Sequence, residues 1–105
     1  MSVIIKDSNG QLVEAFKLGV SQVATVGNTT AATTAFGATT TMVRVAASLG
    51  HCHVAFGANP TASITTSAMI PNNWSEVFAV SPGDKMAYIK DALVTSSTVS
   101  VTELL

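Results

Sequence analysis

Residues 74–104 read WSEVFAVSPGDKMAYIKDALVTSSTVSVTEL, and this stretch decides the fold class. It holds three short segments, 74–80, 85–90 and 98–104, and the first and last alternate apolar with polar side chains. Alternation with a period of two is typical of a β-strand that buries one face. The intervening residues 81–84, SPGD, have proline and glycine at the two central positions, as a type II turn requires. The stretch therefore predicts three consecutive strands joined by turns.

Further strands are predicted upstream of this stretch. Residues 42–47, MVRVAA, and 51–57, HCHVAFG, are rich in valine and other residues that favour strands, and Leu49-Gly50 separates them. A proline-containing turn at residues 58–61 then leads into 62–70, which we expect to be a strand or an extended segment.

The N-terminal part is less regular. Residues 3–5 and 12–16 are expected to be the two arms of a hairpin joined through 7–10, although 12–16 also fits a short helix. Residues 20–26 alternate and predict a strand. The Thr-rich segment 29–41 is either an exposed loop or a strand whose two faces differ little, so its register is weakly specified.

The pattern as a whole predicts an all-β fold, an antiparallel β-sandwich of seven to nine short strands. Its 105 residues suit a single domain, 1–105, in which residues 1–40 form an arm or hairpin and the Thr-rich segment. An immunoglobulin-like sandwich and a small jelly roll both fit this length. The expected core residues are Val43, Val45, Val54, Phe56, Ile64, Met69, Phe78, Val80, Met86, Tyr88, Val99 and Val101.

The charge content excludes several functions. Charged residues make up 10% of the chain against a usual share of about 25%, and the net charge is −1. No basic patch is present, so we expect no nucleic-acid partner and no attachment to an anionic membrane. No apolar run is long enough for a transmembrane helix, and the N-terminus does not resemble a signal peptide. The single cysteine, Cys52, rules out an intrachain disulfide.

The sequence His51-Cys52-His53 is the one cluster that resembles a metal site. On a strand, His51 and His53 would share one face and Cys52 would point to the other. Two imidazoles can chelate a metal, but a zinc site needs a third ligand, and the chain contains no further histidine. We therefore expect no metal and no cofactor, with a buried, unreactive thiol at Cys52.

No catalytic motif accompanies this cluster. The chain has no Gly-x-Ser-x-Gly elbow, no phosphate-binding glycine loop and no carboxylate pair near either histidine. We therefore expect a protein that is not an enzyme and that has no small-molecule substrate. Trp74, Phe78 and Tyr88 are expected to pack in the core, with a sugar-stacking platform as the alternative.

The second half of the chain resembles a family of small virion proteins from tailed phages. The motifs that carry the resemblance are 42–45 (MVRV), 52–62 (CHVAFGANPTA), 69–71 (MIP), 74–80 (WSEVFAV), 82–87 (PGDKMA) and 99–104 (VSVTEL). They occur in matching order and spacing and cover roughly residues 40–105. Residues 1–40 carry no such resemblance.

The resemblance implies a phage capsid decoration (cement) protein that binds the outer surface of the shell and stabilises it. Its partners would be the major capsid protein and further copies of itself, as a homotrimer. It would be made in the host cytoplasm and end in the virion, on the outer capsid surface. A neck, tail or fibre-attachment component is one alternative, and a module that binds carbohydrate on the host surface is another.

Two segments are candidates for the attachment. Either could add a strand to the edge of a partner's sheet. The candidate partner-binding residues are Val3, Ile4, Ile5, Leu12 and Phe16 in the N-terminal arm, and Thr39, Thr40 and Thr41 in the Thr-rich segment.

Overall fold

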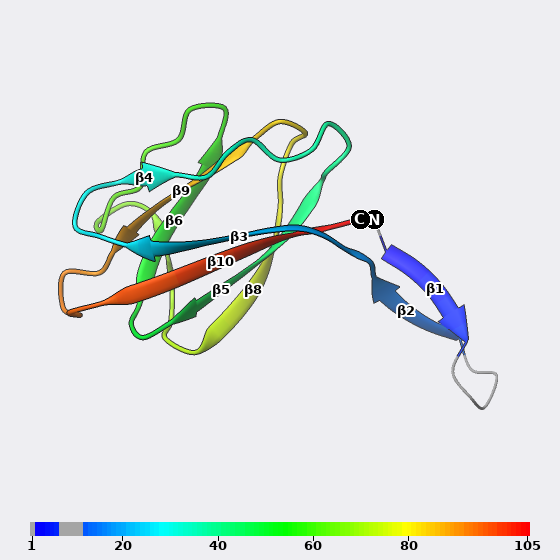
Figure 1. The fold of residues 1–105 in the computed structure, drawn as a ribbon, viewed down its shortest axis with the longest axis horizontal. Helices are drawn as coiled ribbons and strands as arrows, with labels where there is room; N and C mark the ends of the chain where they lie inside the picture. The colour runs from blue at the N-terminus through cyan, green and yellow to red at the C-terminus, as the bar shows by residue number, and fades with distance from the viewer. Residues whose placement is uncertain (1, 7–11) are drawn as a thin grey trace.

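The computed structural model describes residues 2–6 and 12–105, and these residues form ten strands and no helix (Figure 1). The strands are β1 Ser2–Lys6, β2 Leu12–Phe16, β3 Leu18–Val26, β4 Ala31–Ala32, β5 Met42–Ser48, β6 Cys52–Gly57, β7 Ala68–Ile70, β8 Trp74–Ala79, β9 Lys85–Lys90 and β10 Ser97–Leu104. The predicted all-β class is confirmed. No helix long and apolar enough to cross a membrane occurs among the described residues.

Strands β1 and β2 form a separate two-stranded sheet. They pair antiparallel, with Ser2 opposite Phe16 and Lys6 opposite Leu12. The predicted hairpin is therefore confirmed for its two arms, and the helix considered for residues 12–16 is wrong. The hairpin projects from one end of the molecule, away from the other strands (Figure 1).

The remaining eight strands form two antiparallel sheets packed face to face, in the orders β3-β10-β5-β8 and β4-β9-β6-β7. The chain passes from one sheet to the other at every connection except β6 to β7, which are neighbours in one sheet. Eight strands in this order form a jelly roll, so the jelly roll is the correct choice between the two predicted sandwiches. The pairing of β3 with β10 joins the first and last strands of the sandwich.

The core lies between the two sheets and follows from the alternation along the central strands. Val43, Val45 and Ala47 of β5 point inward, and the register sets Val45 opposite Val101 of β10. Met86 is fully buried across the sandwich. Burying one such side chain contributes roughly 1.5–3 kcal/mol, so these alternating positions supply much of the stability of the sandwich.

Most of the predicted core is confirmed. Val43, Val45, Val54, Met86, Val99 and Val101 are buried, and Phe56, Phe78, Val80 and Tyr88 are half-buried against them. Two predictions are wrong, because Ile64 and Met69 are exposed. Ile64 lies in the loop between β6 and β7, and Met69 lies on the outward side of β7, whose inward side chain is Ile70.

The Thr-rich segment is mainly a loop that packs on its own sandwich. It contributes only the short β4, and Phe36 inserts from it into the core, 6.4 Å from the ring of Phe56. The Gly37 amide and the Thr40 hydroxyl both donate hydrogen bonds to Oε1 of the buried Glu103, at 2.8 Å for the amide. A hydrogen-bonded carboxylate thus fixes a segment whose side chains alone specify little.

Candidate functional site

The outer face of the β3-β10-β5-β8 sheet has an unusual composition. The register aligns its side chains in rows, for example Ser21, Thr102, Arg44 and Val77 across the four strands. The twelve outward residues, which we call the flat face, are Ser21, Val23 and Thr25 of β3, Thr98, Ser100 and Thr102 of β10, Arg44, Ala46 and Ser48 of β5, and Ser75, Val77 and Ala79 of β8. Arg44 is its single charge.

All twelve side chains of the flat face are at least partly exposed. Ser21 Oγ and Thr102 Oγ1 lie 2.8 Å apart and join β3 to β10 across the surface. Side chains this short have few rotamers to lose when a partner covers them, and they bring almost no charge that must be desolvated. The flat face is therefore well suited to protein contact.

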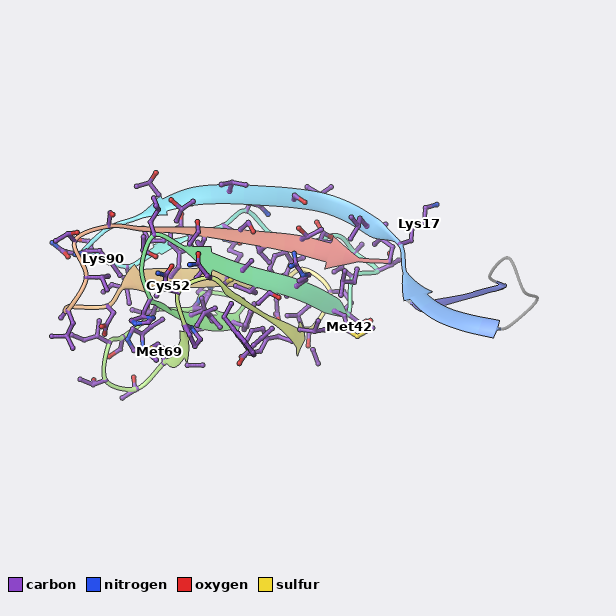
Figure 2. All side chains as sticks on the ribbon, turned by 90° about the horizontal axis from the view of Figure 1, so that it is seen from below. Lys17, Met42, Cys52, Met69 and Lys90 are labelled. Atoms are coloured by element: carbon purple, nitrogen blue, oxygen red, sulfur yellow. The ribbon has the colours of Figure 1, made fainter. Side chains whose placement is uncertain are left out.

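The opposite sheet differs because the chain covers its outer face. Ala87 alternates with the core residue Met86 and so points outward, yet it is fully buried. The loop of residues 58–67 accounts for this cover, since Ala62 within it is buried and its amide bonds to Thr30 Oγ1 at 3.0 Å. Figure 2 shows the segment around Met69 and the loop before it on the side of the molecule opposite β3. Of the two sheets of the sandwich, β3-β10-β5-β8 is the one whose outer face no other described segment covers.

The two histidines do not converge on a metal. His53 is 7% exposed, and its Nδ1 lies 3.1 Å from the Ser67 carbonyl oxygen while its Nε2 lies 3.1 Å from Asp91 Oδ1. Both ring nitrogens of His53 therefore lie within hydrogen-bond distance of an oxygen atom of the chain, and neither faces an open position where a metal could bind. Nδ1 of His51 is also engaged, since it accepts the Asn72 amide at 2.8 Å.

Among residues 2–6 and 12–105, no group of three or more histidine, cysteine, aspartate or glutamate side chains is arranged to hold a metal ion. Cys52 is part of the core, and burial raises the pKa of its thiol to about 11, against a weaker lowering by a hydrogen bond with Ser97. The thiol therefore stays protonated near neutral pH, which makes it a poor nucleophile.

Asp91 supplies a pH-dependent contact. The hydrogen bond from His53 is the main cause that lowers the pKa of the Asp91 carboxyl group below its ordinary value. A carboxyl group whose pKa is lower in the folded chain stabilises the fold above its unfolded pKa, about 3.9, and this contribution is lost as the pH falls through the folded pKa. The contact therefore stabilises the β9–β10 loop at neutral pH.

We expect Asp91→Asn to lower the melting temperature at pH 7 and to have almost no effect at about pH 2, where the wild-type carboxyl group is protonated as well. Thermal unfolding followed by circular dichroism between pH 2 and pH 8 measures this difference. Glu76→Gln, at an exposed position of β8, controls for the change in net charge. A difference between wild type and Asp91→Asn that stayed constant over the whole range would contradict the expectation.

The predicted partner-binding residues are only partly available. Thr39 and Thr41 are exposed, but Thr40 is buried on Glu103, so its assignment to a partner contact is wrong. The structure describes the backbone of β1 and β2, and the side chains of Val3, Ile4, Ile5, Leu12 and Phe16 lie outside what it describes. The prediction for those five residues stays a prediction.

The structure separates the three aromatic residues for which core packing was predicted and a sugar-stacking platform was the alternative. Phe78 packs against Phe56, with ring centroids 5.2 Å apart, and Tyr88 packs on the core. Trp74, in contrast, is 59% exposed. The core assignment is thus correct for Phe78 and Tyr88 and wrong for Trp74.

The sequence-based search for sites missed the flat face, although a signal for it was present. Residues 98–104 alternate cleanly, so the burial of Val99 and Val101 places Thr98, Ser100 and Thr102 on the other side. Metal and catalytic sites are marked by rare residue types, whereas this face consists of common small ones.

Comparison with known proteins gives a likeness in fold. No protein-family model and no curated protein sequence matches the chain. Similar solved structures include FeII HppE and Fe(II)-HppE with the alternative substrate (S)-1-HPP, each with a TM-score of 0.53 and 12% sequence identity. The alignment covers 97% of this chain and 55% of theirs, so this chain spans about half the length of HppE. The Schizosaccharomyces pombe Cnp3 cupin domain aligns with a TM-score of 0.44 and 11% identity, over 99% of this chain and 82% of the domain.

The expectation that the chain is not an enzyme is corrected by this comparison. That expectation rested on the absence of catalytic motifs. The fold is shared with HppE, which has been solved with Fe(II) and with a substrate. At 12% identity the likeness transfers the fold and no individual residue, so it removes the exclusion without naming a reaction.

Proposed function

We propose that the chain is a phage capsid decoration protein that binds the outer surface of the major capsid protein shell. The observation that carries the proposal is the flat face, a bare sheet surface of twelve residues with one charge at Arg44. The resemblance of residues 40–105 to small virion proteins of tailed phages supports the choice of partner.

The size of the flat face indicates that it does not act alone. A stable interface uses about 20–30 residues on each side, which is roughly twice the number on this face. The hairpin of β1 and β2 can supply the rest, because it stands away from the sandwich (Figure 1). A two-stranded hairpin is at best marginally stable in water, so contact with a partner would stabilise it.

The proposed effect on the shell follows from mass action. A protein that binds the assembled shell and not its separated subunits stabilises the shell by the free energy of binding at each site. Many weak sites repeated over one particle therefore add up to a large resistance to dissociation. The position on the outer capsid surface and synthesis in the host cytoplasm belong to this proposal as predictions. The homotrimer that the resemblance implies is one oligomeric state of the free protein, and sedimentation distinguishes it from a dimer.

We expect Ser100→Glu to reduce binding to empty expanded shells of the phage at least tenfold. Ser100 lies at the centre of the flat face on β10, and a glutamate there would bury an unpaired charge in the contact. Co-sedimentation of purified protein with shells measures the binding.

The matched control is Thr66→Glu, which places the same charge on the exposed part of the loop that covers the opposite sheet. This variant should bind like the wild type, and both variants should melt close to the wild-type temperature. Wild-type protein that fails to bind shells, or equal weakening by both variants, would refute the proposal.

A further inference from the structure

The sandwich has four outer strand edges, and they differ in how well they are protected against pairing with another chain. Edges are usually protected by shortness, charge or proline. β4 and β7 have two and three residues, and β8 carries Glu76 near its middle. β3 has nine residues, 18–26, with neither a charge nor a proline among them. It is the least protected edge of the sandwich.

The outer side of β3 is also unpaired along its length. β3 pairs with β10 on one side, and no strand of the described residues lies on its other side. The backbone hydrogen bonds near this strand lie beyond its ends, where the Lys17 oxygen accepts from the Leu105 nitrogen at 2.7 Å and the Gly27 oxygen accepts from the Lys90 nitrogen at 2.9 Å. Within the strand the side chain of Gln22 accepts the Thr34 amide at 3.0 Å, and this contact leaves the outer backbone groups of β3 without a strand partner. Val23, in the middle of this stretch, is 71% exposed.

We infer that β3 pairs antiparallel with β3 of a second copy of this chain across a twofold axis at Val23. This inference goes beyond the proposed function, because the pairing needs no shell. A register centred on Val23 sets Ser21 opposite Thr25 of the second copy, and the paired stretch runs from Ser21 to Thr25. Every side chain in that stretch is uncharged, so each copy meets a surface as neutral as its own.

The charge pattern favours this edge over β8 for pairing of two copies. A β8–β8 contact would bring Glu76 of each copy close together, which is unfavourable. A register shift where β3 runs from Ser21 to Leu18 limits the pairing at the other end. Gly19 lies within this shift, packed against Leu105, so the regular edge begins at Ser21.

The pairing would have a direct effect on the flat face. Joining two β3 edges continues the sheet, so two four-stranded sheets become one eight-stranded sheet with the flat faces on the same side. The continuous surface has twice the residues of one copy and reaches the size of an ordinary protein interface.

The first test is sedimentation of the free protein, without shells, over a range of concentrations. We expect a dimer for the wild type and at least a tenfold larger dissociation constant for Val23→Lys, because lysine at a strand edge opposes pairing. Val77→Lys, on the β8 edge where Val77 is 52% exposed, should leave the dimer intact. A wild type that stays monomeric, or a trimer that Val23→Lys leaves unchanged, would overturn the inference.

The second test is disulfide crosslinking and does not depend on lysine being tolerated. Opposed residues of antiparallel strands have Cα atoms about 4.5–5.5 Å apart, within the range that a disulfide spans. Val23→Cys should give a covalent dimer under mild oxidation, while Val77→Cys should give little. The native Cys52 will not interfere, because it is buried with a pKa of about 11. Equal crosslinking at positions 23 and 77 would count against β3 pairing.

Discussion

Replacing Gly50 with alanine is expected to lower the free energy of unfolding by about 3 kcal/mol. A Cβ atom at this position would lie 2.2 Å from the backbone oxygen of Ser96 and 3.0 Å from Cγ2 of Val94. The oxygen cannot move alone, because Ser96 directly precedes β10, and the next residue, Ser97, donates its hydroxyl to the Gly50 oxygen at 2.9 Å. The added methyl group would push the β5–β6 turn away from the β9–β10 loop.

Urea denaturation followed by circular dichroism measures this change. Gly27→Ala is the matched control, since a Cβ there meets nothing within 4 Å. We expect the control to alter stability by less than about 1 kcal/mol, and to increase it if the unfolded chain loses entropy. A Gly50→Ala variant as stable as Gly27→Ala would show that the two loops are not in contact.

Replacing Ile70 with alanine is expected to cost about 3 kcal/mol, because its fully buried side chain would leave a cavity between the sheets. The neighbouring Met69, 46% exposed on the other side of β7, provides the control. We expect Met69→Ala to cost about 0.5 kcal/mol, as is usual for a surface position.

The same denaturation measurement compares the two variants directly. It also tests the inward and outward sides of β7, which the sequence pattern assigned the other way round. A larger loss for Met69→Ala than for Ile70→Ala would mean that β7 pairs with β6 in a register shifted by one residue.

Strands with clean alternation and strong turns could be predicted from the sequence. β5, β9 and β10 lie within one residue of the predicted ranges. The SPGD turn is also as predicted, since Gly83 has a φ of 82° and the Asp84 amide donates to the Ser81 oxygen at 3.0 Å. In these segments local preference and tertiary packing favour the same conformation.

Positions fixed by distant parts of the chain could not be predicted in this way. The Leu49-Gly50 break was recognised, but Leu49, with a φ of 67°, adopts the left-handed conformation, and the glycine is required for its small size beside Ser96. Phe36 lies in a low-complexity segment, where no periodicity indicates that one residue enters the core. The need for glycine at position 50 and the burial of Phe36 both depend on contacts with segments far away in the sequence.

The candidate site was difficult to predict for a related reason. Metal and catalytic motifs are recognised by rare residues at fixed spacing, and His51 and His53 attracted attention for that reason. The flat face consists of common residues whose importance depends on sheet order, because only the order shows which face the loop of residues 58–67 covers. Alternation in the sequence separates the two faces of each strand. It does not show which outer sheet face is left uncovered by the rest of the chain.

The pairing of β3 with β10 also determines when the sandwich can form during synthesis of the chain. The ribosome makes residues 18–26 before residues 27–96 and only then residues 97–104, so β3 has no β10 to pair with until β4 to β9 have been synthesised. During that interval neither edge of β3 is paired with another strand. Because β3 has no charged residue, nothing opposes its pairing with nascent chains made on the same messenger RNA. Slow, long-range pairing of this kind exposes β3 to association with other chains while it waits, so we expect the yield of native protein to depend on chaperone access during synthesis.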